Sequence, residues 1–131
     1  MEPSRAKELI GLLSERSTAW QSLWNVFYTV AGAIVTLILS GKLPGASLCF
    51  ASSVSTVVFL LFAVGNYRSL NELRKQREAL IDFVIENAEG NPHIEKVAQA
   101  AAPPTPSGLK IYHWGLSILV VVLLWIGTIL Q

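Results

Sequence analysis

The stretch STAWQSLWNVFYTVAGAIVTLILSGKLPGASLCFASSVSTVVFLLFAVGNY, residues 17–67, decides the fold because it holds a single charged side chain, Lys42. That lysine separates two uncharged windows of 25 residues each, 17–41 and 43–67. A third uncharged window, 21 residues long, lies at 111–131. Since about 20 predominantly apolar residues span a bilayer as a helix, the sequence predicts an all-α membrane protein with three transmembrane helices.

The composition agrees with a membrane protein. Of 131 residues, 52% are hydrophobic and 15% are charged, against roughly 25% charged residues in an average soluble domain. The net charge of +1 gives no general attraction to nucleic acid. Cys49, the one cysteine, cannot form an internal disulfide. These counts exclude a small soluble enzyme and a disulfide-stapled secreted module.

The first two spans are expected to form an antiparallel hairpin over residues 19–65. The first span is predicted at 19–40 and the second at 44–65. The connection between them reads GKLPG, and its glycines and proline favour a tight turn from which Pro44 can begin the next helix. Two spans joined so closely must run antiparallel.

An amphipathic helix is predicted at residues 1–18. Its apolar side chains recur at helical spacing on one face and are Ala6, Leu9, Ile10 and Leu13. Pro3 suits the first position of such a helix. Two interpretations stay open: a helix that lies on the membrane surface, and a helical lead-in to the first span.

A second amphipathic helix is predicted at residues 66–88 as a cytoplasmic extension of the second span. No proline interrupts residues 45–91, so we expect one straight helix there. At 1.5 Å per residue, about 40 residues make a rod roughly 60 Å long. A three-four spacing of apolar residues makes one face of this extension a candidate for oligomerisation: Leu70, Leu73, Leu80 and Val84.

Residues 89–110 are rich in alanine and proline and are predicted to link this extension to the third span. Within them, Asn91–Pro92 can start a short helix that runs through Ala102. The proline-rich run at 103–108 is typical of a semi-rigid spacer. The third span is expected at 111–131.

The distribution of basic residues predicts the orientation. Nine of the ten Lys and Arg residues lie before the first span or between the second and third, and Lys42 alone lies in the tight turn. Since basic residues collect on the cytoplasmic side, we expect a multi-pass protein of the bacterial inner (plasma) membrane, with the N-terminus cytoplasmic and the C-terminus outside. Five aromatic residues fall at the expected cytoplasmic interface, where amphipathic rings concentrate: Trp20, Trp24, Tyr67, Tyr112 and Trp114.

No pattern in the sequence indicates catalysis. The expected spans hold no Asp, Glu, Lys or Arg, and the two histidines, His93 and His113, lie in different segments. No glycine-rich phosphate loop or nucleophile elbow is present. His113 is expected to be an interfacial anchor, with a pH sensor as the alternative. We therefore expect no enzyme activity, no cofactor and no metal site.

Polar and small residues in the first span share one helix face. The steps between them are four, three, four and four residues, and the set is Gln21, Asn25, Tyr28, Gly32 and Thr36. Polar groups at membrane depth need partners or water. This face suits either an aqueous path in an oligomer or packing against another helix, and both interpretations stay open.

Small residues in the second span favour close helix packing, because they let two backbones approach. The set is Gly45, Cys49, Ser52, Ser53 and Thr56. No large polar side chain belongs to it, so packing is favoured over a water path.

Basic residues border the expected cytoplasmic end of the second span. The set is Arg68, Arg74, Lys75 and Arg77. Contact with anionic lipid is one interpretation, and a site for an anionic ligand or partner is the other. Glu72, Glu78 and Asp82 interleave with these residues and dilute their charge.

The hairpin at residues 19–65 and the following segment NYRSLNELRKQREALIDFVIEN, residues 66–87, resemble the SLATT-type membrane effectors of bacterial conflict systems in layout. Such effectors have two close-packed spans followed by a cytoplasmic helical extension. The resemblance implies a pore under the control of a nucleotide-based sensor, in antiphage defence. The third span, 111–131, departs from that layout.

These observations together predict a small homo-oligomer in the lipid bilayer. The leading functional expectation is an ion-conducting pore or gated membrane effector. The alternative is a non-conducting accessory or scaffold subunit of a larger membrane complex. A cytoplasmic regulatory protein or an anionic ligand is the further expected partner.

Overall fold

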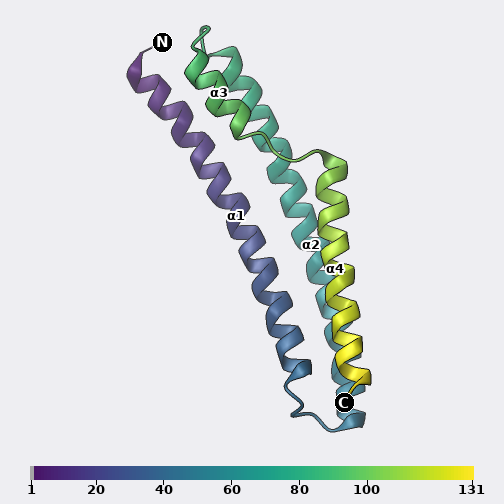
Figure 1. The fold of residues 1–131 in the computed structure, drawn as a ribbon. Helices are drawn as coiled ribbons and strands as arrows, with labels where there is room; N and C mark the ends of the chain where they lie inside the picture. The colour runs from purple at the N-terminus through teal and green to yellow at the C-terminus, as the bar shows by residue number, and fades with distance from the viewer. Residues whose placement is uncertain (1) are drawn as a thin grey trace.

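The computed structural model describes residues 2–131 and consists of helices joined by short connections (Figure 1). The helices are α1 (Pro3–Leu39), α2 (Gly45–Glu86), α3 (Pro92–Ala100) and α4 (Pro106–Ile129). Three of them, α1, α2 and α4, are long and apolar enough to cross a membrane. The prediction of an all-α membrane protein with three spans is confirmed, and the chain is a multi-pass membrane protein.

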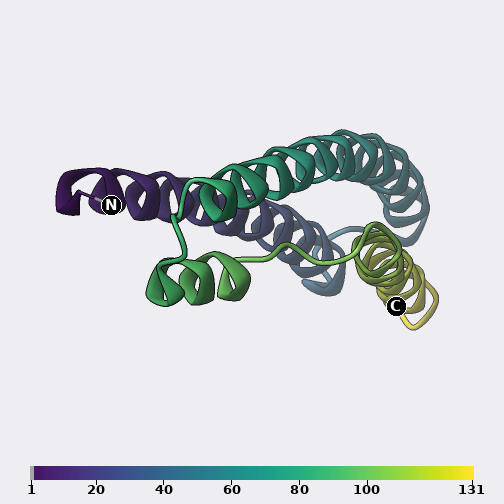
Figure 2. The same cartoon turned by 90° about the horizontal axis from the view of Figure 1, so that it is seen from above.

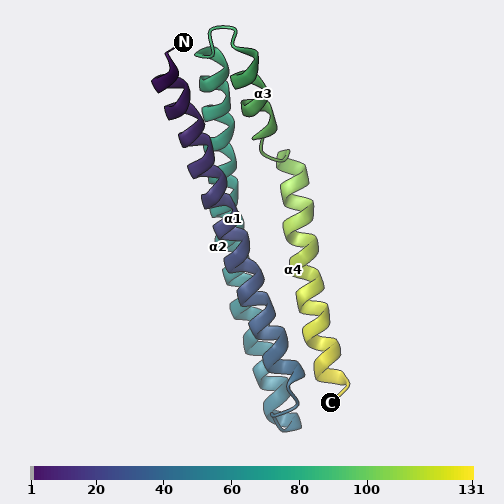
Figure 3. The same ribbon diagram turned by 60° about the vertical axis from the view of Figure 1, so that its left-hand side comes forward.

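The helices form a long, narrow bundle with two different halves. α1 and α2 make an antiparallel hairpin, and α4 lies beside the half of it that contains the α1–α2 connection (Figure 1). Figure 3 shows α3 and α4 in succession along one side of this hairpin. Viewed from above, α3 and α4 lie well apart and are joined by an extended connection (Figure 2). We call the half that holds α3 the polar end and the half that holds α4 the membrane half.

Both long helices of the hairpin are continuous. α2 has 42 residues, which at 1.5 Å per residue is about 63 Å, so the second span passes into its extension without a break, as expected. α1 has 37 residues and includes the amphipathic N-terminal segment. This segment therefore leads straight into the first span, which is the second of the two interpretations considered above.

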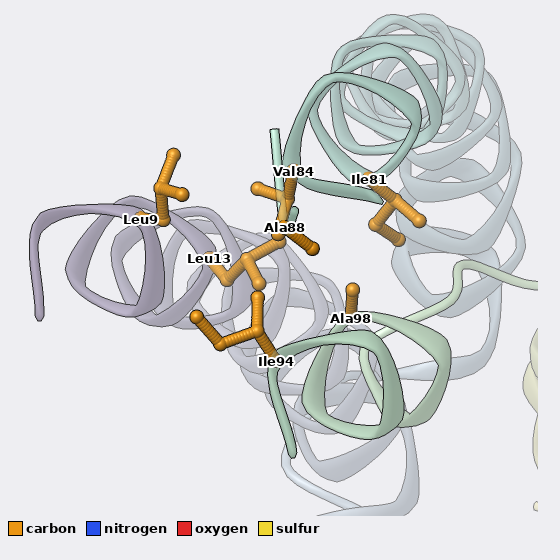
Figure 4. Close-up of a cluster of buried hydrophobic side chains, with 7 residues drawn as sticks. All are labelled: Leu9, Leu13, Ile81, Val84, Ala88, Ile94 and Ala98. Atoms are coloured by element: carbon orange, nitrogen blue, oxygen red, sulfur yellow. The ribbon is translucent and has the colours of Figure 1, made fainter. Parts of the chain in front are cut away.

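The apolar face of the N-terminal segment packs inside the polar end. Leu9 and Leu13 of α1 meet residues of α2 and α3 in one buried cluster (Figure 4). The cluster consists of Leu9, Leu13, Ile81, Val84, Ala88, Ile94 and Ala98. α3 starts at Pro92, where the Asn91 side chain accepts a hydrogen bond from the backbone N–H of His93 at 3.1 Å, a typical N-cap. It ends at Ala100, two residues before the expected end.

Apolar packing joins all three spans in the membrane half. Phe27 and Ala31 of α1 pack against Phe59 and Ala63 of α2, with Trp114 and other α4 side chains around them. A further cluster near the α1–α2 connection is formed by Ile38, Leu48 and Leu124. α4 begins at Pro106 after Thr105, whose hydroxyl accepts a hydrogen bond from Gly108 N–H at 3.1 Å.

Candidate functional site

The polar face of the first span lies on the outside of the protomer. All five of its members are exposed: Gln21, Asn25, Tyr28, Gly32 and Thr36. At 100° per residue this face is centred about 120° around α1 from the buried Phe27 and Ala31. We call it the polar stripe. Apart from Tyr28, which contacts α4, its members lie outside the packed clusters of the membrane half.

In the part of the chain that the structure describes, the Gln21 and Asn25 side-chain amides have no hydrogen-bond partner. Among residues 2–131, the hydrogen bond recorded at Asn25 is to its backbone carbonyl, from the Thr29 hydroxyl at 2.8 Å. The Tyr28 hydroxyl does have a partner, the Tyr112 hydroxyl of α4 at 3.1 Å. A polar group that faces hydrocarbon without a partner is costly, so the Gln21 and Asn25 amides require water or another protein chain.

The small residues of the second span divide into two groups. Ser52 is fully buried and its hydroxyl lies 2.5 Å from that of Thr128, while the Thr56 hydroxyl accepts a hydrogen bond from Trp125 Nε1 at 3.1 Å. These two residues tie α2 to α4, which is the expected packing role. The other three are exposed and do not contribute to this contact: Gly45, Cys49 and Ser53.

The leucine-patterned face of α2 is already covered within the protomer. Leu70 and Val84 are fully buried, Leu73 is buried, and Leu80 is half-buried. Val84 and Leu80 belong to the cluster that α1 and α3 complete. These side chains therefore find their apolar partners inside one chain.

The basic residues do not form one surface. Arg68 and Lys75 are exposed, and Lys75 pairs with Glu72 at 3.0 Å. Arg74 is 7% exposed and donates to Glu78 at 2.9 Å. Arg77 is also buried. The cluster of four is thus split between the surface and the interior.

Arg77 connects three elements of the chain. Its Nη2 donates to the carbonyl of Ala101, just after α3, at 2.6 Å, and its guanidinium carbon lies 5.5 Å from the ring centroid of Trp20 on α1. Its side chain is 8% exposed, and this burial lowers the pKa of the guanidinium. Arg77 therefore holds the end of α3 against the hairpin.

A buried polar pair at the α2–α4 contact was not predicted from the sequence. Asn66 Nδ2 lies 3.4 Å from Nε2 of His113, and His113 is fully buried. Within residues 2–131 its Nδ1 has no hydrogen-bond partner. Aromatic rings surround the imidazole with centroids 4.9–5.8 Å away and belong to Trp24, Phe27, Tyr67 and Trp114. The expectation that His113 anchors at the interface is wrong, because the ring faces the other helices.

An aromatic cleft between α1 and α4 was also not predicted from the sequence. The cleft has a volume of about 250 Å³, and its lining is Trp20, Trp24, Tyr28, Pro104, Gly108, Leu109 and Tyr112. The four-residue spacing of the aromatic residues of α1 was the available signal, since it places them along one face. Trp24 stacks on Tyr28 at 5.7 Å and meets Tyr112 edge-on at 5.3 Å, between ring centroids. We refer to this feature as the aromatic cleft.

Comparisons of the chain with family models, with curated proteins and with solved structures found no match. Among residues 2–131 there is no group of three His, Cys, Asp or Glu side chains that could hold a metal ion.

Proposed function

We propose that the protein assembles as a homo-oligomer whose α1 helices enclose an ion-conducting path. The observation that carries this proposal is the exposure of the polar stripe, with the Gln21 and Asn25 side chains directed away from the protomer's own core. Several copies arranged around an axis would bring these neutral amides to a common centre, where water can solvate them. The costly exposure to lipid is then removed.

The residues of the polar stripe indicate what such a path would be like. Its members are neutral, so it offers hydrogen-bonding groups without the rings of charge that select strongly between cations and anions. Gly32 has no side chain and has open space where a Cβ would stand, so it would not narrow the path. A weakly selective pore fits these side chains better than a transporter of a charged substrate.

A non-conducting scaffold is the second candidate, and the same glycine favours it. Gly32 has nothing within 4 Å of the Cβ position, and it lies four residues before Thr36. Small residues at this spacing let another membrane helix approach closely. In that case the stripe would hydrogen-bond to a helix of a larger complex instead of to water.

The biological context of the proposed pore comes from the layout of the chain. The continuous hairpin with its long extension resembles SLATT-type effectors, in which pore activity is placed under a cytoplasmic sensor. We accordingly propose a gated effector of the bacterial inner membrane, with the polar end in the cytoplasm and a role in antiphage defence. The basic residues of the polar end support this orientation.

Ion flux and particle mass together test the proposal. Protein purified in detergent is expected to have the mass of an oligomer, and a monomer would contradict both the pore and its assembly. Reconstituted into liposomes with a potassium gradient, the oligomer is expected to release the gradient faster than empty liposomes do. An oligomer that leaves the gradient intact at every voltage and pH tested would favour the scaffold.

A further inference from the structure

Arg77 is a buried cation that pairs with no carboxylate of the described residues, 2–131. Neither of the ion pairs recorded among residues 2–131 includes it. Its partners are neutral: the carbonyl of Ala101 and the ring of Trp20. Buried charges in proteins are usually paired, and a guanidinium has five N–H donors. This side chain therefore has both the charge and the free donors to hold an anion supplied from outside the chain.

Arg77 and the aromatic cleft are neighbours through Trp20. Trp20 belongs to both, since it lines the cleft and carries the guanidinium against its ring. The cleft is lined by residues 20–28 of α1, near the start of the uncharged window 17–41, and by residues 104–112, which lead into the uncharged window 111–131. The Trp20 end of the cleft is where the apolar stretches of the spans begin, and hence where lipid headgroups are expected.

A neighbouring cavity contains Arg74, which differs from Arg77 in having carboxylates beside it. This cavity has a volume of about 230 Å³ and shares Pro104 with the aromatic cleft. Arg74 lines it, but so do Glu78 and Asp82, and Arg74 is bonded to Glu78 at 2.9 Å. The charge of Arg74 is thus balanced within the chain.

We propose that the aromatic cleft binds one anionic phospholipid per chain, with an acyl chain against Trp24, Tyr28 and Tyr112 and the phosphate beside Arg77. A phospholipid satisfies both halves of the site, because its chain suits the aromatic walls and its phosphate suits a bidentate guanidinium. The site does not depend on whether the oligomer conducts ions. A bound lipid would join α1 to the start of α4.

Lipid binding to delipidated protein in detergent, counted by native mass spectrometry, tests this site. Dioleoyl phosphatidylglycerol is expected to bind at one molecule per chain and about five-fold more tightly than dioleoyl phosphatidylcholine, which is the scale of one basic residue near anionic lipid. Arg77→Gln is expected to remove this preference. The matched control Arg68→Gln, which changes an exposed arginine of the same helix, is expected to keep it.

Variants of the cleft wall keep the test decisive if Arg77→Gln fails to fold. Tyr112→Ala removes an exposed wall of the cleft and is expected to lose phosphatidylglycerol binding, whereas Tyr112→Phe keeps the ring and is expected to retain it. Inorganic phosphate alone is expected not to compete, because it has no chain for the cleft. Equal binding of the two lipids, unchanged binding in Tyr112→Ala, or competition by phosphate would overturn the proposal.

Discussion

Nδ2 of Asn66 lies 3.4 Å from Nε2 of His113, and this contact joins α2 to α4 where both side chains are buried. The two residues are 47 positions apart in the chain. Since aromatic rings enclose the imidazole, each member depends on the other for a polar partner. Sliding α4 along the hairpin would separate them, so the pair fixes the register of α4 against α2.

Removing one member of this pair is expected to destabilise the protein. Asn66→Leu leaves both ring nitrogens of His113 buried without a partner, which costs about 1–3 kcal/mol. Thermal unfolding in detergent, followed by circular dichroism, measures the loss. The double variant Asn66→Leu with His113→Phe is expected to recover part of it, because no unpaired polar group remains. A double variant whose loss equals the sum of the two single losses would show that the side chains act independently.

The helices could be predicted from the sequence because their signals are local. Absence of charge located the spans, and prolines marked helix starts: Pro3, Pro92 and Pro106 all stand at the first turn of a helix. The absence of proline from residues 45–91 predicted the continuous α2. Each of these signals is read from neighbouring residues and needs no knowledge of how the helices pack.

The interior contacts could not be predicted because they join distant residues. Arg77 looked like a member of a surface cluster, and its burial depends on Trp20, 57 positions earlier, and on the end of α3. His113 likewise lies in the core because it packs against α2. The sequence of a helix face does not reveal which other helix covers it. For the same reason, the leucine pattern around Leu70 was expected to contact other copies of the chain, whereas its side chains are covered within one chain.

The docking of α3 on the hairpin is expected to depend on Ala98. This residue is fully buried in the cluster with Ile81, so Ala98→Asp would place an unpaired carboxylate in an apolar interior. α3 is then expected to detach and expose its connections. Limited proteolysis should cut the 87–91 connection at least several-fold faster than in the unmodified protein. Ala100→Asp, on the exposed face of the same helix, is the control and is expected to leave the rate unchanged; equal rates for both variants would contradict the docking.

The hydroxyl contact between Ser52 and Thr128 is expected to stabilise the α2–α4 contact modestly. Thr128→Val keeps the side-chain volume and removes the buried hydroxyl, and hydrogen bonds between membrane helices contribute roughly 0.6 kcal/mol on average. The free energy of unfolding in detergent should fall by about that amount. Ser53→Ala removes an exposed hydroxyl that bonds only the Cys49 carbonyl of its own helix, and it is expected to have no measurable effect. A larger loss for Ser53 than for Thr128 would contradict this assignment.

Asn25 provides the sharpest distinction between a conducting path and a packing face. In the proposed pore, Asn25→Leu replaces a ring of amides by a ring of apolar side chains, and a hydrophobic constriction impedes water and ions. Potassium flux from liposomes is expected to fall about ten-fold or more while the mass of the detergent-purified oligomer stays the same. Ser53→Val makes a comparable polar-to-apolar change on an exposed face of α2, outside the polar stripe, and is expected to leave both flux and mass unchanged. If Asn25→Leu instead disperses the oligomer, the amide acts in helix packing; if flux is unaltered in an intact oligomer, the polar stripe does not line the path.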